Sequence, residues 1–106
     1  METGSHIQIT TAIDTRERAE AVARALLEQR LVACAQICGP IASTYWWKGK
    51  IECADEWMIV MKTREALYEK AEQAIRALHP YETPEIIAVP IKAGLAEYLR
   101  WIEGET

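Results

Sequence analysis

The sequence predicts an α+β domain, in which an antiparallel sheet carries helices on one face. Alternating apolar and polar residues predict strands, and apolar residues spaced by three and four predict helices. These segments follow one another as strand, helix, strand, strand, helix, strand and a terminal helix. That order is typical of the split β-α-β, or ferredoxin-like, arrangement. A chain of 106 residues fits a single such domain.

The first strand and the first helix follow directly from this periodicity. Apolar residues at every second position of 7–13 predict a half-buried strand. Asp14, followed three residues later by Glu17, forms a candidate capping box for a helix over 15–30. Spacings of three and four define the face of this helix that we expect to be buried, which carries Ala19, Val22, Ala23, Leu26 and Leu27.

A long β-hairpin is predicted for the middle of the chain. Residues 32–47 indicate a strand with a bulge or bend at Gly39-Pro40, Lys48-Gly49 suits the turn, and residues 50–62 return. Each arm would span roughly 40 Å, whereas a domain of this size has a radius of gyration of about 13 Å. The hairpin therefore overhangs its own domain, unless it folds back at Pro40 onto its own helices.

The predicted tip of this hairpin is rich in large apolar side chains. Tyr45, Trp46, Trp47 and Ile51 gather there. Proteins usually cover exposed strand edges and apolar patches with another element or another chain. We therefore expect the hairpin to mediate association with further copies of the chain.

The second half of the chain contains a helix, a proline-bracketed loop, a strand and a terminal helix. Pro80 and Pro84 restrict the residues that precede them, so the second helix ends at His79 and a loop follows. Residues 85–91 then predict the fourth strand. The apolar positions of the two helices are Leu67, Ala71, Ile75 and Leu78, and Leu95, Tyr98, Leu99 and Ile102.

Composition and charge exclude several classes of protein. A net charge of -4 argues against a general nucleic-acid-binding protein. No apolar run approaches the roughly 20 residues of a membrane helix, and the N-terminus lacks a basic region followed by an apolar block. We therefore predict a cytoplasmic protein with neither nucleic acid nor membrane as partner. Residues 1–6 are set apart as a tail that resembles an expression remnant, and 7–106 as the domain.

The cysteines indicate a reducing compartment. Three cysteines cannot all be paired in disulfides within one chain. The spacing of Cys34 and Cys38 suggests a metal pair, but on a regular strand these residues stand about 13 Å apart. Two sulfurs on one zinc, each at about 2.3 Å, lie less than about 5 Å from one another. We expect small buried side chains here, unless a bend at Gly39-Pro40 brings the two thiols together.

Four segments carry a family resemblance: Leu31-Val32-Ala33-Cys34, Tyr45-Trp46-Trp47-Lys48-Gly49-Lys50-Ile51, Lys62-Thr63 and His79-Pro80-Tyr81-Glu82-Thr83-Pro84-Glu85-Ile86-Ile87. Together they resemble the family of the divalent-cation tolerance protein CutA, over residues 7–102. The resemblance implies a ferredoxin-like subunit of a tight homotrimer, reminiscent of the nitrogen-regulatory PII signalling proteins. It also implies a link to copper and other divalent cations, and no catalytic reaction. Gln36 departs from the asparagine common in this family.

The candidate metal ligands, for copper or zinc, are His79, Cys34 and Glu82. Imidazole and thiolate suit copper and zinc, and a carboxylate is a harder ligand. His79 and Cys34 would share a cleft if the last strand docks beside the first helix and strand. In the alternative interpretation Cys34 packs as a small apolar group, His79 caps the second helix as a cation, and Glu82 is solvated.

Lys62, Tyr81 and Trp101 are the candidate contacts to a small ligand. Lys62 can neutralise an anion in a cleft between subunits or extend to solvent, and the two aromatic residues can bind or simply pack. Two functions remain open. The first is a homotrimeric copper-binding protein of metal-ion tolerance, and the second is a PII-like signalling or scaffold module that binds an anionic ligand between subunits.

No motif indicates an enzyme. The sequence has no Gly-rich phosphate loop, no Gly-x-Ser-x-Gly elbow and no His-Glu-x-x-His helix. Cys34 and His79 could act as nucleophile and base, but no third residue is evident to orient them. We therefore expect a protein without catalytic residues.

Overall fold

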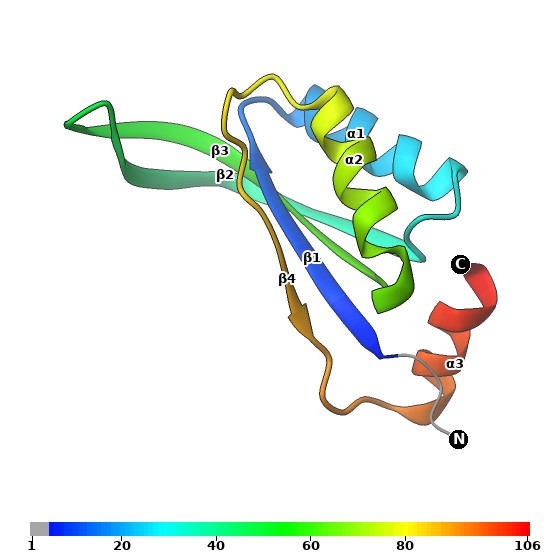
Figure 1. The fold of residues 1–106 in the computed structure, drawn as a ribbon. Coiled ribbons are helices and arrows are strands. Elements are labelled where there is room, and N and C mark those ends of the chain that lie inside the picture. Colours follow the sequence, from blue (N-terminus) through cyan, green and yellow to red (C-terminus); the bar gives the residue numbers. More distant parts are fainter. Residues whose placement is uncertain (1–4) are drawn as a thin grey trace.

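A four-stranded antiparallel sheet in the order β2-β3-β1-β4 forms the centre of the protein, and α1 and α2 pack against it (Figure 1). The computed structural model describes residues 5–106. Fold class and element order are as predicted. The strands are β1 His6–Ile13, β2 Cys34–Trp47, β3 Lys50–Arg64 and β4 Ile86–Pro90, and the helices are α1 Arg16–Glu28, α2 Tyr68–Leu78 and α3 Ala96–Glu105, with a 3-10 turn over Glu65–Leu67.

The core lies between the sheet and the two helices. Side chains alternate along a strand, so every second residue of β1 and β3 points toward α1 and α2. Two residues expected in the core are exposed instead: Leu27 is 40% and Leu78 47% accessible. Leu27 lies one position after the buried Leu26, about 100° around the axis, and Leu78 is the last residue of its helix. The buried residues include Ile7, Ile9, Ile13, Ala19, Val22, Leu26, Ile59, Met61, Ala71 and Ile75.

The N-terminus of α1 differs from the prediction by one residue. Thr15, not Asp14, is the N-cap, and its Oγ1 accepts a hydrogen bond of 3.1 Å from the Arg18 backbone N–H. Asp14 instead accepts a 2.7 Å ion-pair contact from the Arg18 guanidinium. The helix ends at Glu28, short of the predicted end, and Arg30 then adopts a left-handed backbone with φ of 59°.

The hairpin of β2 and β3 extends beyond the body of the protein and does not fold back (Figure 1). The molecule measures 49 × 25 × 22 Å as a result. The predicted bulge lies between Cys38 and Ile41. Lys48 and Gly49 form the tip with φ of 50° and 80°, the left-handed pair of a type I′ turn, whose twist matches that of the strands.

The N- and C-terminal parts of the described chain meet beside the start of β1. His6, predicted to belong to the tail, instead begins β1, and its Nε2 lies 2.7 Å from Glu103 Oε2 of α3. Residues 1–4 of the predicted tail lie outside the described residues. In α3 the expected position Ile102 is buried, whereas Tyr98 is partly exposed and Leu95 precedes the helix. None of the helices formed by residues 5–106 is long and apolar enough to cross a membrane.

Candidate functional site

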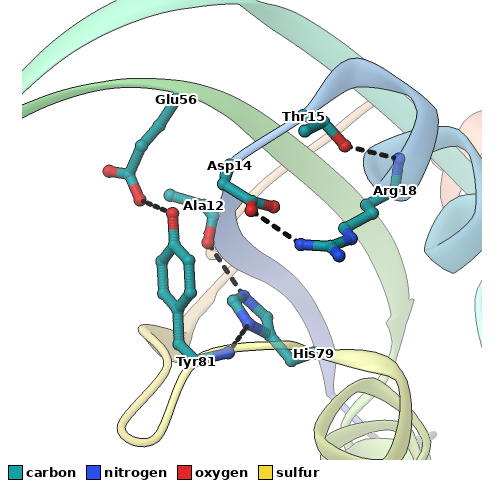
Figure 2. A network of polar contacts seen from close by, with 7 residues as sticks. All are labelled: Ala12, Asp14, Thr15, Arg18, Glu56, His79 and Tyr81. Carbon is teal, nitrogen blue, oxygen red and sulfur yellow. Dashed lines mark hydrogen bonds and ion pairs between the residues drawn. The ribbon is translucent and has the colours of Figure 1, made fainter.

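His79 is held by hydrogen bonds at both ring nitrogens (Figure 2). It is the C-cap of α2, in extended backbone because Pro80 follows. Nδ1 accepts a 3.3 Å bond from the Tyr81 backbone N–H, so Nε2 carries the proton and donates a 2.9 Å bond to the Ala12 carbonyl. Burial lowers the pKa of His79, partly offset by the bond to Ala12. The ring is therefore a neutral cap rather than the cationic one expected.

Tyr81 connects this loop to the hairpin. Its Oη donates a 2.7 Å hydrogen bond to Glu56 Oε2 on β3, and its ring meets the His79 ring edge-on at 4.7 Å (Figure 2). Burial, followed by the bond to Glu56, raises the pKa of Tyr81, so the phenol remains a donor throughout the physiological range. Glu56 was not predicted, because its place near the loop depends on the pairing of β3 with β1, in which Ala12 and Ile13 lie opposite Met58 and Trp57.

A cleft of about 700 Å³ lies between the hairpin and the loop that contains Tyr81. We call it the hairpin cleft. One wall comes from β2 and β3, and the other from residues 81–85. Its lining residues are Ala12, Ser43, Thr44, Tyr45, Trp46, Trp47, Glu56, Tyr81, Glu82, Thr83, Pro84 and Glu85. The predicted residues Tyr81 and Glu82 are therefore brought together here, with Glu82 exposed at the rim.

Cys34 lies far from His79, contrary to the expectation of a shared cleft. Cys34 pairs with Lys62, which pairs with Gln8, whereas His79 is bonded at Ala12, four residues or about 13 Å further along β1. One chain therefore does not place this thiol and this imidazole on one metal ion or in one catalytic pair. Within residues 5–106, no group of three or more His, Cys, Asp and Glu side chains is arranged to hold a metal ion.

The three predicted small-ligand residues are likewise divided between two regions. Lys62 donates a hydrogen bond to Gln36 Oε1 on the neighbouring strand. Trp101 stacks on Tyr98 at 5.5 Å, and Tyr98 Oη lies 3.5 Å from Cys34 Sγ. Lys62 and Trp101 therefore belong to the Cys34 end of the sheet, and Tyr81 to the hairpin cleft at the other end.

The ferredoxin-like sheet with an overhanging hairpin defines a class of small α+β proteins. The family described as CutA1 divalent ion tolerance protein matches residues 7–105, and the chain belongs to this family. The "Divalent-cation tolerance protein CutA" of Archaeoglobus fulgidus is 46% identical over 87 residues, covering 82% of this chain and 84% of that protein. The crystal structure of CutA from Xylella fastidiosa has a TM-score of 0.93 at 39% identity, covering 95% of this chain and 97% of that one.

A longer plant relative matches as well. "Protein CutA 1, chloroplastic" of Oryza sativa subsp. japonica is 35% identical over 100 residues. The match covers 94% of this chain and 56% of the rice protein, so the chain spans little more than half of that relative. The resemblance seen in the sequence is confirmed by these comparisons.

Proposed function

We propose that the protein is a homotrimer that binds divalent cations, with copper as the preferred ion, and acts in metal-ion tolerance without catalysing a reaction. Membership of the CutA1 family supports this role. The exposed hairpin tip is the observation that supports the trimer, because Trp46 is 72% and Ile51 61% exposed there. Apolar side chains this accessible on an overhanging ribbon favour contact with another chain.

The position of the hairpin favours a closed ring of subunits. β2 and β4 are the two edges of the sheet, and Ile87 and Val89 of β4 are half-exposed. A hairpin that overhangs one subunit can rest on a different surface of the next, which is a heterologous contact. Heterologous contacts that close on themselves form rings, and three copies make the smallest ring beyond a dimer.

Molecular mass in solution tests the assembly. Size exclusion with light scattering at micromolar concentration should give a mass near three times 12.0 kDa. A stable species of one chain mass over the whole concentration range would reject the proposal.

His79 can contribute to a copper or zinc site through Nδ1. Metal-bound histidines commonly donate their other ring N–H to a backbone carbonyl, which orients the ring. His79 already has that arrangement, with Nε2 bonded to Ala12. A metal ion bound at Nδ1 would replace only the longer of the two hydrogen bonds of the ring, the one from the Tyr81 backbone N–H. Glu82 lies in the same loop and is the candidate carboxylate ligand. Cys34 then belongs to a separate, softer site suited to Cu(I).

Calorimetry with Cu²⁺ and Zn²⁺ separates these two sites. His79→Ala should weaken Cu²⁺ binding at least tenfold, and His6→Ala is the matched control for loss of a histidine. Affinity should also fall at acidic pH, as the pH approaches the lowered pKa of His79, because the coordinating nitrogen must be unprotonated. Equal Cu²⁺ affinity in the wild type and His79→Ala would remove His79 from the site. Loss of binding in Cys34→Ser alone would assign it to the thiolate.

The second candidate function is a PII-like module that binds an anionic small ligand between subunits. The observation that favours it is the cluster at the Cys34 end of the sheet, where Lys62 supplies a cation beside Gln36 and the Tyr98–Trp101 stack supplies an aromatic surface. Stabilisation against heat by nucleotides or carboxylates without metal, lost in Lys62→Gln, would favour this function. Stabilisation by metal alone would favour the first.

We also propose a reducing, cytoplasmic location. Cys34, Cys38 and Cys53 are free thiols, and Cys38 and Cys53 are exposed. Fractionation of the native source should recover the protein with its thiols reduced. Recovery with Cys38 or Cys53 oxidised in an oxidising compartment would contradict this location.

A further inference from the structure

The hairpin cleft combines negative charge with aromatic walls. Its lining includes three carboxylates and four aromatic side chains, and no Lys, Arg or His is among the lining residues described. Ile41, Ser43 and Tyr45 are paired with Glu56, Ala54 and Glu52, respectively, so residues 43, 45 and 47 of β2 share the face of Glu56. Trp46 pairs with Ile51 on the opposite face. Trp46 also borders the cleft, so the cleft and the surface proposed for assembly adjoin at the hairpin tip.

Glu56 is the most constrained of the three carboxylates. Its residue is 8% exposed, although it lines the cleft. Among the described residues its hydrogen-bond partner is the neutral Tyr81 hydroxyl, at Oε2, and no Lys or Arg lies in ion-pair contact with it. A buried carboxylate is costly unless a cation or several hydrogen bonds compensate its charge. Glu56 Oε1 is not among the buried unpartnered side-chain atoms of the described residues, so it is open to the cleft and can accept hydrogen bonds from a cation there.

We propose that the hairpin cleft binds a small organic cation through a guanidinium group placed beside Glu56. A guanidinium pairs with carboxylates and stacks on aromatic rings, and Tyr45 and Trp47 provide such rings on the Glu56 face. Glu82 and Glu85 at the loop side add negative charge to the entrance. The aromatic walls offer no ligands to a bare metal ion. This inference does not rest on the proposed metal or trimer function.

Titration of the whole protein in its native assembly with n-butylguanidinium tests the inference, with n-butylurea as the uncharged isostere. Binding is followed by calorimetry and by tryptophan fluorescence, because Trp46 and Trp47 line the cleft. Saturable binding of the cation is expected, with the urea at least about tenfold weaker, since hydrogen bonds to a charged partner are the stronger ones.

Two variants of β3 localise the charge requirement. Glu56→Gln keeps an acceptor for Tyr81 but loses the charge, and it should weaken n-butylguanidinium binding at least about tenfold. Asp55→Asn is the matched control, because the neighbouring Asp55 is exposed, points to the other face and does not line the cleft. Its affinity should equal that of the wild type. Trp47→Leu should weaken binding several-fold through loss of stacking.

Three outcomes would overturn the inference. One is equal binding of n-butylurea and n-butylguanidinium, which would show an apolar pocket without a charge requirement. Another is unchanged affinity in Glu56→Gln. The third is the absence of saturable binding of the cation. If the oligomeric mass of Glu56→Gln also changes, Glu56 pairs with a cationic side chain of a second copy.

Discussion

Tyr81 and Glu56, 25 residues apart in the sequence, are joined by a hydrogen bond of 2.7 Å between the loop after α2 and the hairpin strand β3. The bond connects the proline-bracketed loop to the point where the hairpin leaves the body of the protein. His79, two residues before Tyr81, fixes the same loop to β1 through Ala12. One loop therefore positions both walls of the hairpin cleft.

Tyr81→Phe should destabilise the protein by about 1–3 kcal/mol, because the buried Glu56 carboxylate would lose its hydrogen-bond partner. Urea unfolding at constant protein concentration measures this change. Tyr98→Phe is the control, since Tyr98 Oη contacts a sulfur at 3.5 Å, a weaker interaction, and it should cost less. Equal effects of the two substitutions would show that the bond to Glu56 contributes little.

The stability of the wild type should fall as pH decreases below about 6.5, the ordinary pKa of histidine. The folded-state pKa of His79 is lowered, mainly by burial, so the unfolded chain binds a proton that the folded protein does not. The contribution of His79 is therefore fully present above about pH 6.5. It is lost with decreasing pH until the lowered folded-state pKa is reached, with a slope of at most about 1.4 kcal/mol per pH unit.

Unfolding free energies measured from pH 8 to pH 5 for the wild type and His79→Gln isolate this effect. The difference between the two proteins should depend on pH in the stated window. His6→Gln should keep the pH dependence that His79 causes. Parallel curves for the wild type and His79→Gln would mean that the ring is not neutral in the folded protein.

Gly39→Ala should destabilise the protein by about 1–3 kcal/mol, as overpacking commonly does. A Cβ at Gly39 would lie 2.6 Å from Trp57 Cδ1 and 3.0 Å from the Glu56 carbonyl oxygen. Gly104→Ala is the matched control: nothing lies within 4 Å of its Cβ position in α3, and alanine favours helix by up to about 1 kcal/mol. Thermal unfolding should shift in opposite directions for the two variants.

Substitution of Trp46 and Ile51 by lysine should dissociate the proposed trimer. These paired residues form one exposed apolar face of the hairpin tip, and burial is worth about 25 cal/mol per Å² of apolar surface. The melting temperature of the wild type should also rise with protein concentration, because assembly stabilises the folded chain. An unchanged mass for the double variant would place the interface elsewhere.

Local sequence rules were sufficient for most elements of the fold. Alternation in 7–13, the Lys48-Gly49 turn, the bulge near Gly39-Pro40 and the end of α2 at His79 depend on neighbours within a few residues, and all are found in the structure. The overhang of the hairpin followed from length alone. Leu27 and Leu78 were misplaced because periodicity marks an apolar face but not how much of it the sheet can cover.

The site depended on contacts that sequence spacing does not reveal. Strand register decided that Cys34 lies opposite Lys62, about four residues along the sheet from the His79 contact at Ala12. The same register brought Glu56 to Tyr81 and formed the hairpin cleft. The sequence by itself determined the elements, the family and the exposed hairpin, because these follow from local periodicity and motif identity. Only the tertiary structure decided which charged and aromatic side chains meet, because a slip of one residue in strand pairing would turn each of them to the other face.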